Sequence, residues 1–155
     1  MGYIFSAQTV LGKISIVEQD KKITHLFWDP KNIVNTYEYK ETPLLRDAFL
    51  QLEKYLEWKI KEFSLPLNPQ GTDFMKSVWK ALQNIPYGKT KSYKEIAETI
   101  GIPKAMRAVG MANNKNPIAI FIPCHRVIGH NWDLVGYWWW LENKKKLLKL
   151  EWVEI

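Results

Sequence analysis

The chain has 155 residues, a formal net charge of +6 at pH 7 and 46% hydrophobic residues. That length suits one ordinary domain or two small ones, and the composition excludes a disordered, collagen-like or coiled-coil chain. Cys124 is the only cysteine, which excludes an internal disulfide and any zinc site built on several thiolates. No apolar run approaches the roughly 20 residues that span a membrane, so we expect no membrane partner.

The first third of the chain has the pattern of a small sheet followed by a helix. β-branched residues over 10–17 and 23–27, separated by polar residues, predict a β-hairpin. Apolar residues recur at helical spacing over 43–57 and predict an amphipathic helix. Proline and glycine then punctuate 64–71, which we interpret as a linker.

The linker divides the chain into two expected domains, over 1–68 and 69–155. Apolar spacing in the second predicts a helix over 72–84 and a last amphipathic helix over 141–150. The expected fold class is therefore α+β, with a small N-terminal antiparallel sheet and helix, then a C-terminal helical domain. Four lysines lie in the part of the last helix where the helix dipole favours cations: Lys144, Lys145, Lys146 and Lys149.

The middle of the second domain has the pattern of a helix-turn-helix. Ser92 and Glu95 form a capping box that predicts a short helix, and Gly101 suits the position just after its end. Pro103 suits the first turn of the next helix, which we expect to reach Asn113. Two short helices with a glycine in the turn indicate a helix-turn-helix, although any helical domain contains such pairs.

The sequence Pro-Cys-His-Arg at 123–126 is the sharpest chemical feature. A reactive cysteine needs a neighbour that accepts its proton or lowers its pKa, and His125 and Arg126 supply both kinds of help. The alternative is a buried structural cysteine beside two surface residues. As a base, His125 also needs an orienting acid, and spacing does not choose among four candidates: Asp133, Glu142, Glu151 and Glu154.

Several correctly spaced segments together resemble the methylated-DNA–protein-cysteine methyltransferases, also called O6-alkylguanine-DNA alkyltransferases. The likeness covers roughly 71–151. Around the cysteine it is carried by Asn116-Pro117, 122–128, Gly136-Tyr137 and 147–151. In the helix-turn-helix it is carried by Tyr87-Gly88, Ser92-Tyr93, Ile96-Ala97 and 107–110.

The resemblance implies DNA repair by direct, stoichiometric transfer of an alkyl group from O6-alkylguanine to Cys124. The alkyl group stays on sulfur, so each molecule acts once. The resemblance also implies that His125 deprotonates the thiol through a water, oriented by Glu151. Asn116 would hold the active-site turn, and Tyr93 would donate a proton to the leaving guanine.

The resemblance further implies a monomer that binds double-stranded DNA, in the cytoplasm, without a metal or cofactor. The target base is flipped out of the duplex and Arg107 takes its place; a basic protein suits such binding. The helix-turn-helix enters the minor groove in this family. The other expected DNA contacts are Lys104, Ala108, Asn113 and Arg126, and the base pocket is expected to be lined by Val135, Tyr137, Trp138 and Trp139.

Most of the eight tryptophans depart from the expected pattern, and Trp138–Trp140 stand where a glycine-rich turn is usual in the family. Trp79, on a helical face, has the place of an ordinary core tryptophan. If these indoles close the base pocket, the chain is a non-catalytic protein that binds alkylated DNA. The other hypothesis is that most of the tryptophans stand at glycine positions, in a gene whose UGA codons mean glycine. The suspect positions are Trp28, Trp58, Trp132, Trp138, Trp139, Trp140 and Trp152.

Overall fold

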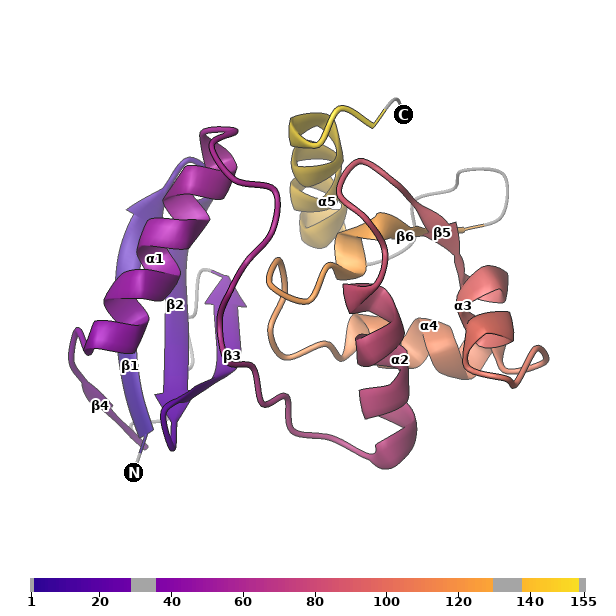
Figure 1. Ribbon diagram of the computed structural model, residues 1–155, viewed down its shortest axis with the longest axis horizontal. Coiled ribbons are helices and arrows are strands. Elements are labelled where there is room, and N and C mark those ends of the chain that lie inside the picture. Colours follow the sequence, from indigo (N-terminus) through magenta and orange to yellow (C-terminus); the bar gives the residue numbers. More distant parts are fainter. Residues whose placement is uncertain (1, 29–35, 130–137, 154–155) are drawn as a thin grey trace. The chain divides into compact units, whose positions relative to one another are not determined.

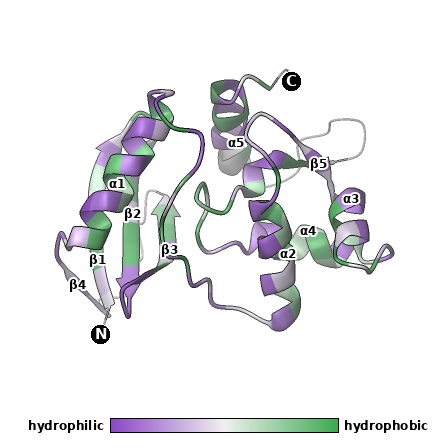
Figure 2. Cartoon of the chain, in the orientation of Figure 1, coloured by the Kyte–Doolittle hydropathy of each residue, from purple (hydrophilic) through white to green (hydrophobic). Residues whose placement is uncertain are grey.

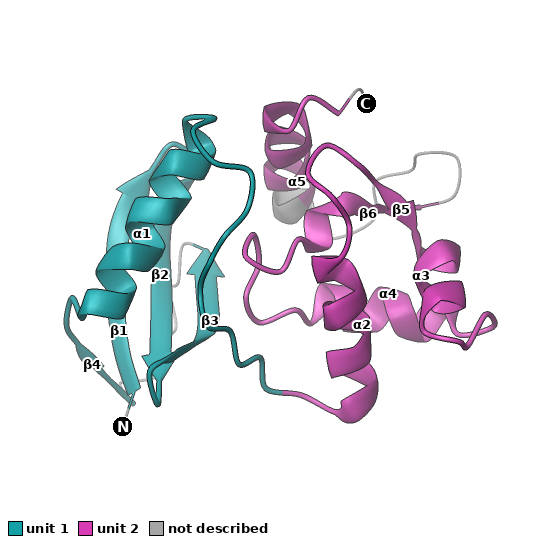
Figure 3. Cartoon of the chain, viewed as in Figure 1, with its two compact units in different colours: residues 1–70 teal, residues 71–155 magenta. Residues whose placement is uncertain are grey.

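The computed structural model describes residues 2–28, 36–129 and 138–153, without the side chains of 138–140. The chain divides into two compact units, Met1–Gln70 and Gly71–Ile155 (Figure 1, Figure 3). Within the described ranges, no helix is long and apolar enough to cross a membrane.

The first unit is built on a four-stranded sheet with the order β3-β2-β1-β4. Strands β1 (Gly2–Thr9), β2 (Gly12–Gln19) and β3 (Lys22–Trp28) pair antiparallel, which confirms the predicted hairpin as β2 and β3. The short β4 (Tyr37–Tyr39) was not predicted, and it pairs parallel with β1 at the sheet edge. The fold class predicted from sequence is thus confirmed, with one parallel edge strand added.

Helix α1 (Pro43–Leu56) packs against this sheet, as the apolar spacing predicts. The Thr42 side chain caps its start by accepting a hydrogen bond from the Leu45 amide at 3.1 Å. Figure 2 shows hydrophobic and hydrophilic residues alternating along α1, the pattern of an amphipathic helix. Its buried face supplies much of the core of this unit: Leu45, Ala48, Phe49, Leu52, Tyr55 and Leu56.

The second unit begins with three helices that pack on one another: α2 (Asp73–Gln83), α3 (Tyr93–Thr99) and α4 (Met106–Asn114). Ser92 and Glu95 make both bonds of the predicted capping box. Helices α3 and α4 together form the predicted helix-turn-helix, in which α4 is the second helix.

The turn between α3 and α4 differs from the prediction in one respect. Gly101 has a φ of 83° just after α3, as expected for a glycine that ends a helix. Pro103, however, lies in the turn itself and not in the first turn of α4. The Ala105 amide closes that turn on the Ile102 carbonyl at 2.9 Å, and this bond delays the start of α4.

The rest of the second unit places the cysteine. The short helix η1 (Cys124–Arg126) leads into β6 (Val127–Ile128), which pairs parallel with β5 (Lys91–Ser92) directly before α3. The last helix, α5 (Trp138–Leu150), packs on η1 and begins three residues earlier than predicted. The strand pair therefore brings the start of α3 beside the cysteine segment.

Two tryptophans occupy backbone conformations that favour glycine. Trp58, after α1, has a φ of 61°, and Trp152, after α5, has a φ of 65°. Each lies at the position where helices commonly end with a left-handed glycine. The following amides close the helix ends in the usual pattern, Lys59 to the Lys54 carbonyl at 2.8 Å and Val153 to Leu148 at 2.9 Å.

The other suspect tryptophans carry less information. Trp28 ends β3 and its indole Nε1 donates to the Leu11 carbonyl at 2.8 Å. Trp132 lies outside the described residues. Residues 138–140 form the start of α5 rather than a separate turn, and their side chains are likewise not described.

If 58 and 152 are glycine positions, replacing either tryptophan should stabilise the protein. Trp58→Gly and Trp152→Gly should each raise the free energy of unfolding by about 1 kcal/mol, because glycine adopts positive φ without steric cost. Chemical denaturation measures this, with Trp58→Ala and Trp152→Ala as controls that keep the strain. Glycine variants no more stable than the alanine variants would contradict the hypothesis, and so would UGG codons at these positions in the gene.

Candidate active site

A strained loop leads to Cys124. Ile120 is buried and has a φ of 75°, a conformation that is rare for a β-branched residue. The Phe121 amide donates to the Ala119 carbonyl at 2.9 Å, so the chain makes a tight γ-turn at Ile120. The Cys124 amide then donates to the Ile122 carbonyl at 2.7 Å, which fixes the direction in which the chain enters η1.

Asn116 holds both ends of this loop. Its Oδ1 accepts a hydrogen bond from the Ile118 amide at 3.0 Å, and its Nδ2 donates to the Ile122 carbonyl at 2.8 Å. Such strain persists only where surrounding contacts over-determine the conformation. Asn116 supplies two of those contacts, which is a physical basis for its expected role in holding the active-site turn.

Glu151, directly after α5, is the centre of a buried hydrogen-bond network. Its Oε2 lies 2.6 Å from His125 Nε2, and its two oxygens accept from Arg126 Nε at 2.8 Å and Nη2 at 3.0 Å. The Gly88 amide donates to Oε1 at 3.2 Å, and Arg126 Nη1 donates to the Ile85 carbonyl at 2.7 Å. Of the four acids that the sequence left open, the structure describes Glu142 and Glu151, and of these two Glu151 contacts His125. Asp133 and Glu154 lie outside the described residues.

The charges of this network set the protonation of His125. Burial acts to raise the pKa of Glu151, but the bonds and charges of His125 and Arg126 outweigh it and hold the pKa well below its ordinary value. Burial lowers the pKa of His125, with Glu151 acting against it. The carboxylate can only accept, so a neutral His125 carries its proton on Nε2 and presents a lone pair on Nδ1.

Cys124 is a buried thiol that needs assistance to react. It is 4% exposed. Burial raises the pKa of its thiol, while a hydrogen bond from Asn116 and the positive charge of Lys144 act to lower it. Since the thiolate is the nucleophile, a neighbouring base and a positive charge are what this sulfur requires.

Four buried polar atoms have no hydrogen-bond partner in the described part of the chain: Tyr93 Oη, Asn113 Oδ1, His125 Nδ1 and Lys144 Nζ. All four belong to residues near Cys124. Asn113 Nδ2 donates to the Cys124 carbonyl at 3.5 Å, and the charge of Cys124 affects the pKa of Tyr93 and of Lys144. Buried polar atoms are normally paired, and leaving one unpaired costs about 1–3 kcal/mol. These four atoms therefore form a cluster of described polar groups beside the thiol of Cys124.

Two residues expected to contact DNA are buried instead. Asn113 is 2% exposed and Arg126 is 7% exposed. Arg126 is drawn inward because Glu151 offers it two hydrogen bonds, and Asn113 faces the cysteine segment. Both therefore support the site from within and are not available to a DNA backbone.

The other residues that the sequence predicts as DNA contacts are exposed on the helix-turn-helix. Lys104, Arg107 and Ala108 are exposed. Three large apolar side chains are also exposed on this segment: Ile102, Met106 and Met111, at 48%, 43% and 61%. A surface that combines basic and apolar side chains suits a widened minor groove, where apolar side chains insert between base steps.

The expected lining of the base pocket is not described. Val135 and Tyr137 lie outside the described residues, and the side chains of Trp138 and Trp139 are likewise not described. Tyr93 is placed at the first position of α3, where its pKa is raised by burial and by Cys124.

Lys144 is a site residue that the sequence reasoning missed. It is fully buried, whereas Lys145, Lys146 and Lys149 are exposed. The signal was present in the sequence, because residues 141, 144, 148 and 151 recur at helical spacing on one face. A lysine on the apolar face of a helix is rare enough to be informative.

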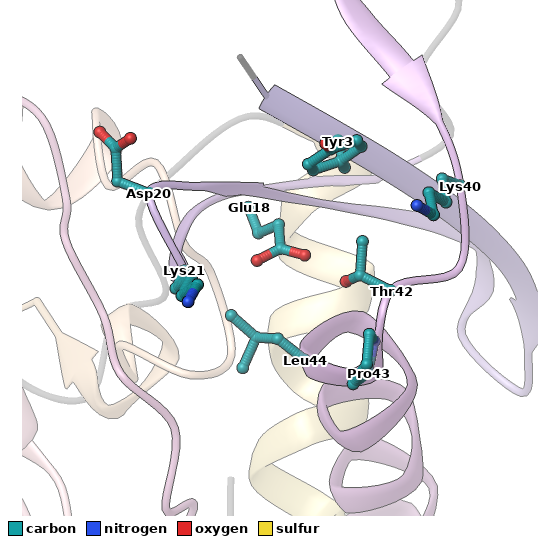
Figure 4. Close-up of a pocket in the computed structure, with 8 residues that line it drawn as sticks. All are labelled: Tyr3, Glu18, Asp20, Lys21, Lys40, Thr42, Pro43 and Leu44. Carbon is teal, nitrogen blue, oxygen red and sulfur yellow. The ribbon is translucent and has the colours of Figure 1, made fainter.

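A separate pocket of about 480 Å³ lies in the first unit (Figure 4). Tyr3, Glu18, Lys40 and Thr42 are among the residues that line it, where the sheet meets the start of α1. None of its lining residues is a cysteine or histidine, so the nucleophile and base lie elsewhere. Among the described residues no group of three or more His, Cys, Asp or Glu could hold a metal ion.

Comparison with known proteins identifies the family. The model of the 6-O-methylguanine DNA methyltransferase DNA-binding domain matches residues 73–153, and that of the ribonuclease-like domain of the same family matches residues 3–69. The constitutive methylated-DNA–protein-cysteine methyltransferase of Bacillus subtilis is 50% identical over 143 residues, covering 88% of this chain and 87% of that protein. The chain therefore belongs to the 6-O-methylguanine DNA methyltransferase family.

Solved structures agree with this assignment. The O6-methylguanine methyltransferase of Mycobacterium tuberculosis is 39% identical with a TM-score of 0.91, covering 97% of this chain and 93% of that one. A complex of the M. tuberculosis protein OGT with DNA gives 40% identity and a TM-score of 0.89, covering 96% and 92%. A second relative, the methylated-DNA–protein-cysteine methyltransferase of Methanosarcina barkeri, is 50% identical over 147 residues, covering 93% of each chain.

Replacing the carboxylate of Glu151 should cost both stability and reactivity. Glu151→Gln should lower the free energy of unfolding by about 3 kcal/mol, because Arg126 would lose its buried counter-charge. Since the native pKa of Glu151 is depressed, its stabilisation is present above the unfolded pKa of about 4.3 and is lost as the pH falls. Unfolding should therefore be less sensitive to acid in the variant than in the parent chain.

The matched control for this prediction is Glu142→Gln, on the exposed side of α5, where the carboxylate lies 4.0 Å from Lys145. It should change stability by less than about 0.5 kcal/mol, as exposed pairs do. Equal effects of the two variants in chemical denaturation would contradict the central position of Glu151.

Asn116→Ala should release the loop before Cys124. Loss of two hydrogen bonds should cost about 1–3 kcal/mol of stability, and the thiol should react more slowly because its approach is no longer fixed. Reaction of Cys124 with a small alkylating reagent, followed by mass spectrometry, measures the rate in the folded variant. An unchanged rate would remove Asn116 from the positioning of the cysteine.

Proposed function

We propose that this chain repairs O6-alkylguanine in double-stranded DNA by accepting the alkyl group on Cys124. The observation that carries the proposal is the buried series Cys124–His125–Glu151, in which Glu151 lies 2.6 Å from His125 Nε2 in a chain of this family. The names of its relatives, methylated-DNA–protein-cysteine methyltransferases, supply the substrate class. A cysteine is present at the position expected for the acceptor, Cys124, and its presence favours transfer over binding alone.

The reaction follows from the groups around the sulfur. His125 Nδ1 takes the thiol proton through a water, and Glu151 stabilises the imidazolium that forms. The thiolate then attacks the alkyl carbon: the carbon–sulfur bond forms, the carbon–O6 bond breaks, and the electron pair passes to the guanine. Tyr93 donates its hydroxyl proton to the guanine, and the imidazolium restores it.

The product explains why the protein acts once. The alkyl group is left on sulfur as a thioether, which is not hydrolysed under physiological conditions. No step regenerates the thiol, so the amount of DNA repaired equals the amount of protein. Such a protein works wherever its DNA lies, in the cytoplasm or nucleoid, and acts as a monomer.

The helix-turn-helix delivers the base to the cysteine. An O6-alkyl carbon inside a stacked duplex is out of reach, so the base must be flipped at a cost of a few kcal/mol. Arg107, exposed on α4, fills the vacated space, and Lys104 and Ala108 lie against the backbone and groove. Phosphate contacts by a chain of net charge +6 make binding independent of sequence and sensitive to salt.

Cys124→Ala should abolish repair while keeping DNA binding, because it removes the acceptor but no exposed charge. The measurement is the loss of O6-methylguanine from a duplex, with duplex affinity by fluorescence anisotropy as the control for folding. Stoichiometric repair by the variant would refute Cys124 as the acceptor.

Arg107→Ala should slow repair of duplex DNA by about tenfold or more, the effect of losing roughly 1.4 kcal/mol of support for the flipped state. Repair of the same base as a free nucleobase should change little, because nothing is flipped. Lys94→Ala, at an exposed lysine of α3, is the matched charge control. Equal slowing on both substrates would exclude the proposed insertion of Arg107.

A further inference from the structure

Lys144 is held in a place where an ammonium group is costly. Its side chain is 0% exposed. Its Nζ has no hydrogen-bond partner among the residues that the structure describes. A buried charge normally has a partner or gives up its proton, since taking it out of water costs several kcal/mol. The fold keeps this lysine buried although the next two positions of α5, Lys145 and Lys146, are solvent-exposed.

Cys124 is the group that can supply a negative charge to the ammonium of Lys144. Helix α5 packs on η1, the short helix that begins at the cysteine. The pKa of Lys144 is lowered from 10.5 to about 8, because burial outweighs the charge of Cys124, which acts to raise it. The lysine in turn acts to lower the pKa of the thiol. The two groups are thus electrostatically coupled, and a coupled pair titrates together.

The other titratable groups near Lys144 do not supply it with a counter-charge. Glu151 already binds His125 and Arg126. Arg126 carries a positive charge, and His125 gains one when it accepts a proton. Positive charge on Arg126 and Lys144 lowers the pKa of His125. Tyr93, on α3, is neutral at physiological pH, because a phenol ordinarily titrates near pH 10 and burial raises the pKa further. Among these groups only the Cys124 thiolate supplies a negative charge that is not already bound.

We propose that Lys144 is a positioning residue that stabilises the thiolate of Cys124 and loses its counter-charge when the sulfur is alkylated. The proposal rests on the proposed function, in which Cys124 is the acceptor. No bond to Lys144 forms or breaks during the transfer: the thiol proton goes to His125, and the ammonium remains beside the thiolate until sulfur becomes a neutral thioether. The alkylated protein then holds a buried ammonium with no counter-charge, so the pKa of Lys144 falls and its ammonium gives up a proton to water more readily.

This role predicts an unusual combination in Lys144→Met, a variant of similar length without charge. Loss of a buried ammonium that has no hydrogen-bond partner in the described part of the chain should raise the melting temperature. The pKa of Cys124 should rise by at least one unit, so the thiolate fraction at pH 7 should fall about tenfold or more. Lys144→Arg restores the charge and should restore most of the thiolate. A lysine with a merely structural role would show lost stability and an unchanged thiol pKa.

The first experiment titrates the ultraviolet absorbance of the thiolate in each variant. Because the chain has one cysteine, subtracting the absorbance of Cys124→Ala leaves the signal of Cys124 alone. Lys145→Met, at an exposed position of the same helix, is the control and should titrate like the parent chain. A thiol pKa unchanged in Lys144→Met, or raised equally in Lys145→Met, would overturn the proposal.

The second experiment needs no substitution and therefore does not depend on how a variant folds. The pKa of Lys144 is measured by NMR of the chain labelled in its lysine side chains, before and after Cys124 is methylated with iodomethane. The pKa should be lower after methylation, since the thiolate that raised it is gone. An equal value in both states would overturn the proposal.

Neither experiment uses DNA, which separates this proposal from the proposed function. If the parent chain takes no methyl group from an O6-methylguanine duplex, the function fails, whatever the thiol titration shows. If it does take the group, Lys144→Met should transfer it about tenfold more slowly at pH 7, with the difference narrowing as the pH rises. Equal rates for Lys144→Met and the parent chain across that pH range would overturn the proposal while leaving the function intact.

Discussion

The buried carboxylate of Glu151 is the interaction on which the second unit depends. It ties together three segments that are distant in sequence: the turn at Gly88, the short helix that carries His125 and Arg126, and the end of α5. Because Arg126 bonds both to Glu151 and to the Ile85 carbonyl, the end of η1 is fixed from two sides. The same carboxylate that holds this fold together also fixes the tautomer of His125, so folding and chemistry share one group.

Several features near Cys124 lower the stability of the folded chain. The left-handed Ile120, the buried Nδ1 of His125, which has no partner among the described residues, and the buried ammonium of Lys144 each cost free energy, and all lie near Cys124. Sites of this kind keep such features only because the surrounding contacts are strong, here those of Asn116 and Glu151. The left-handed tryptophans 58 and 152 are a different matter, since they lie at helix ends and serve no chemistry that the structure shows.

Most of the fold could be predicted from the sequence, because the signals that define its helices and turns are local. The capping box at Ser92, the apolar spacing of α1 and the glycine after α3 each act within a few residues. The edge strand β4 has three residues and a parallel partner, and nothing in its own sequence marks it. The burial of Asn113 and Arg126 depends on segments far along the chain, so only the three-dimensional structure shows it. The burial of Lys144 also depends on distant segments, but helical spacing alone already places this residue on the apolar face of α5.

The most direct test of the account is the mass of the intact protein after incubation with an excess of duplex containing O6-methylguanine. The account predicts a gain of one methylene mass per chain and no more, with peptide mapping that assigns it to Cys124. A chain that binds the duplex but gains no mass, or one that repairs more lesions than there are protein molecules, would contradict a single-use acceptor built around Cys124, His125 and Glu151.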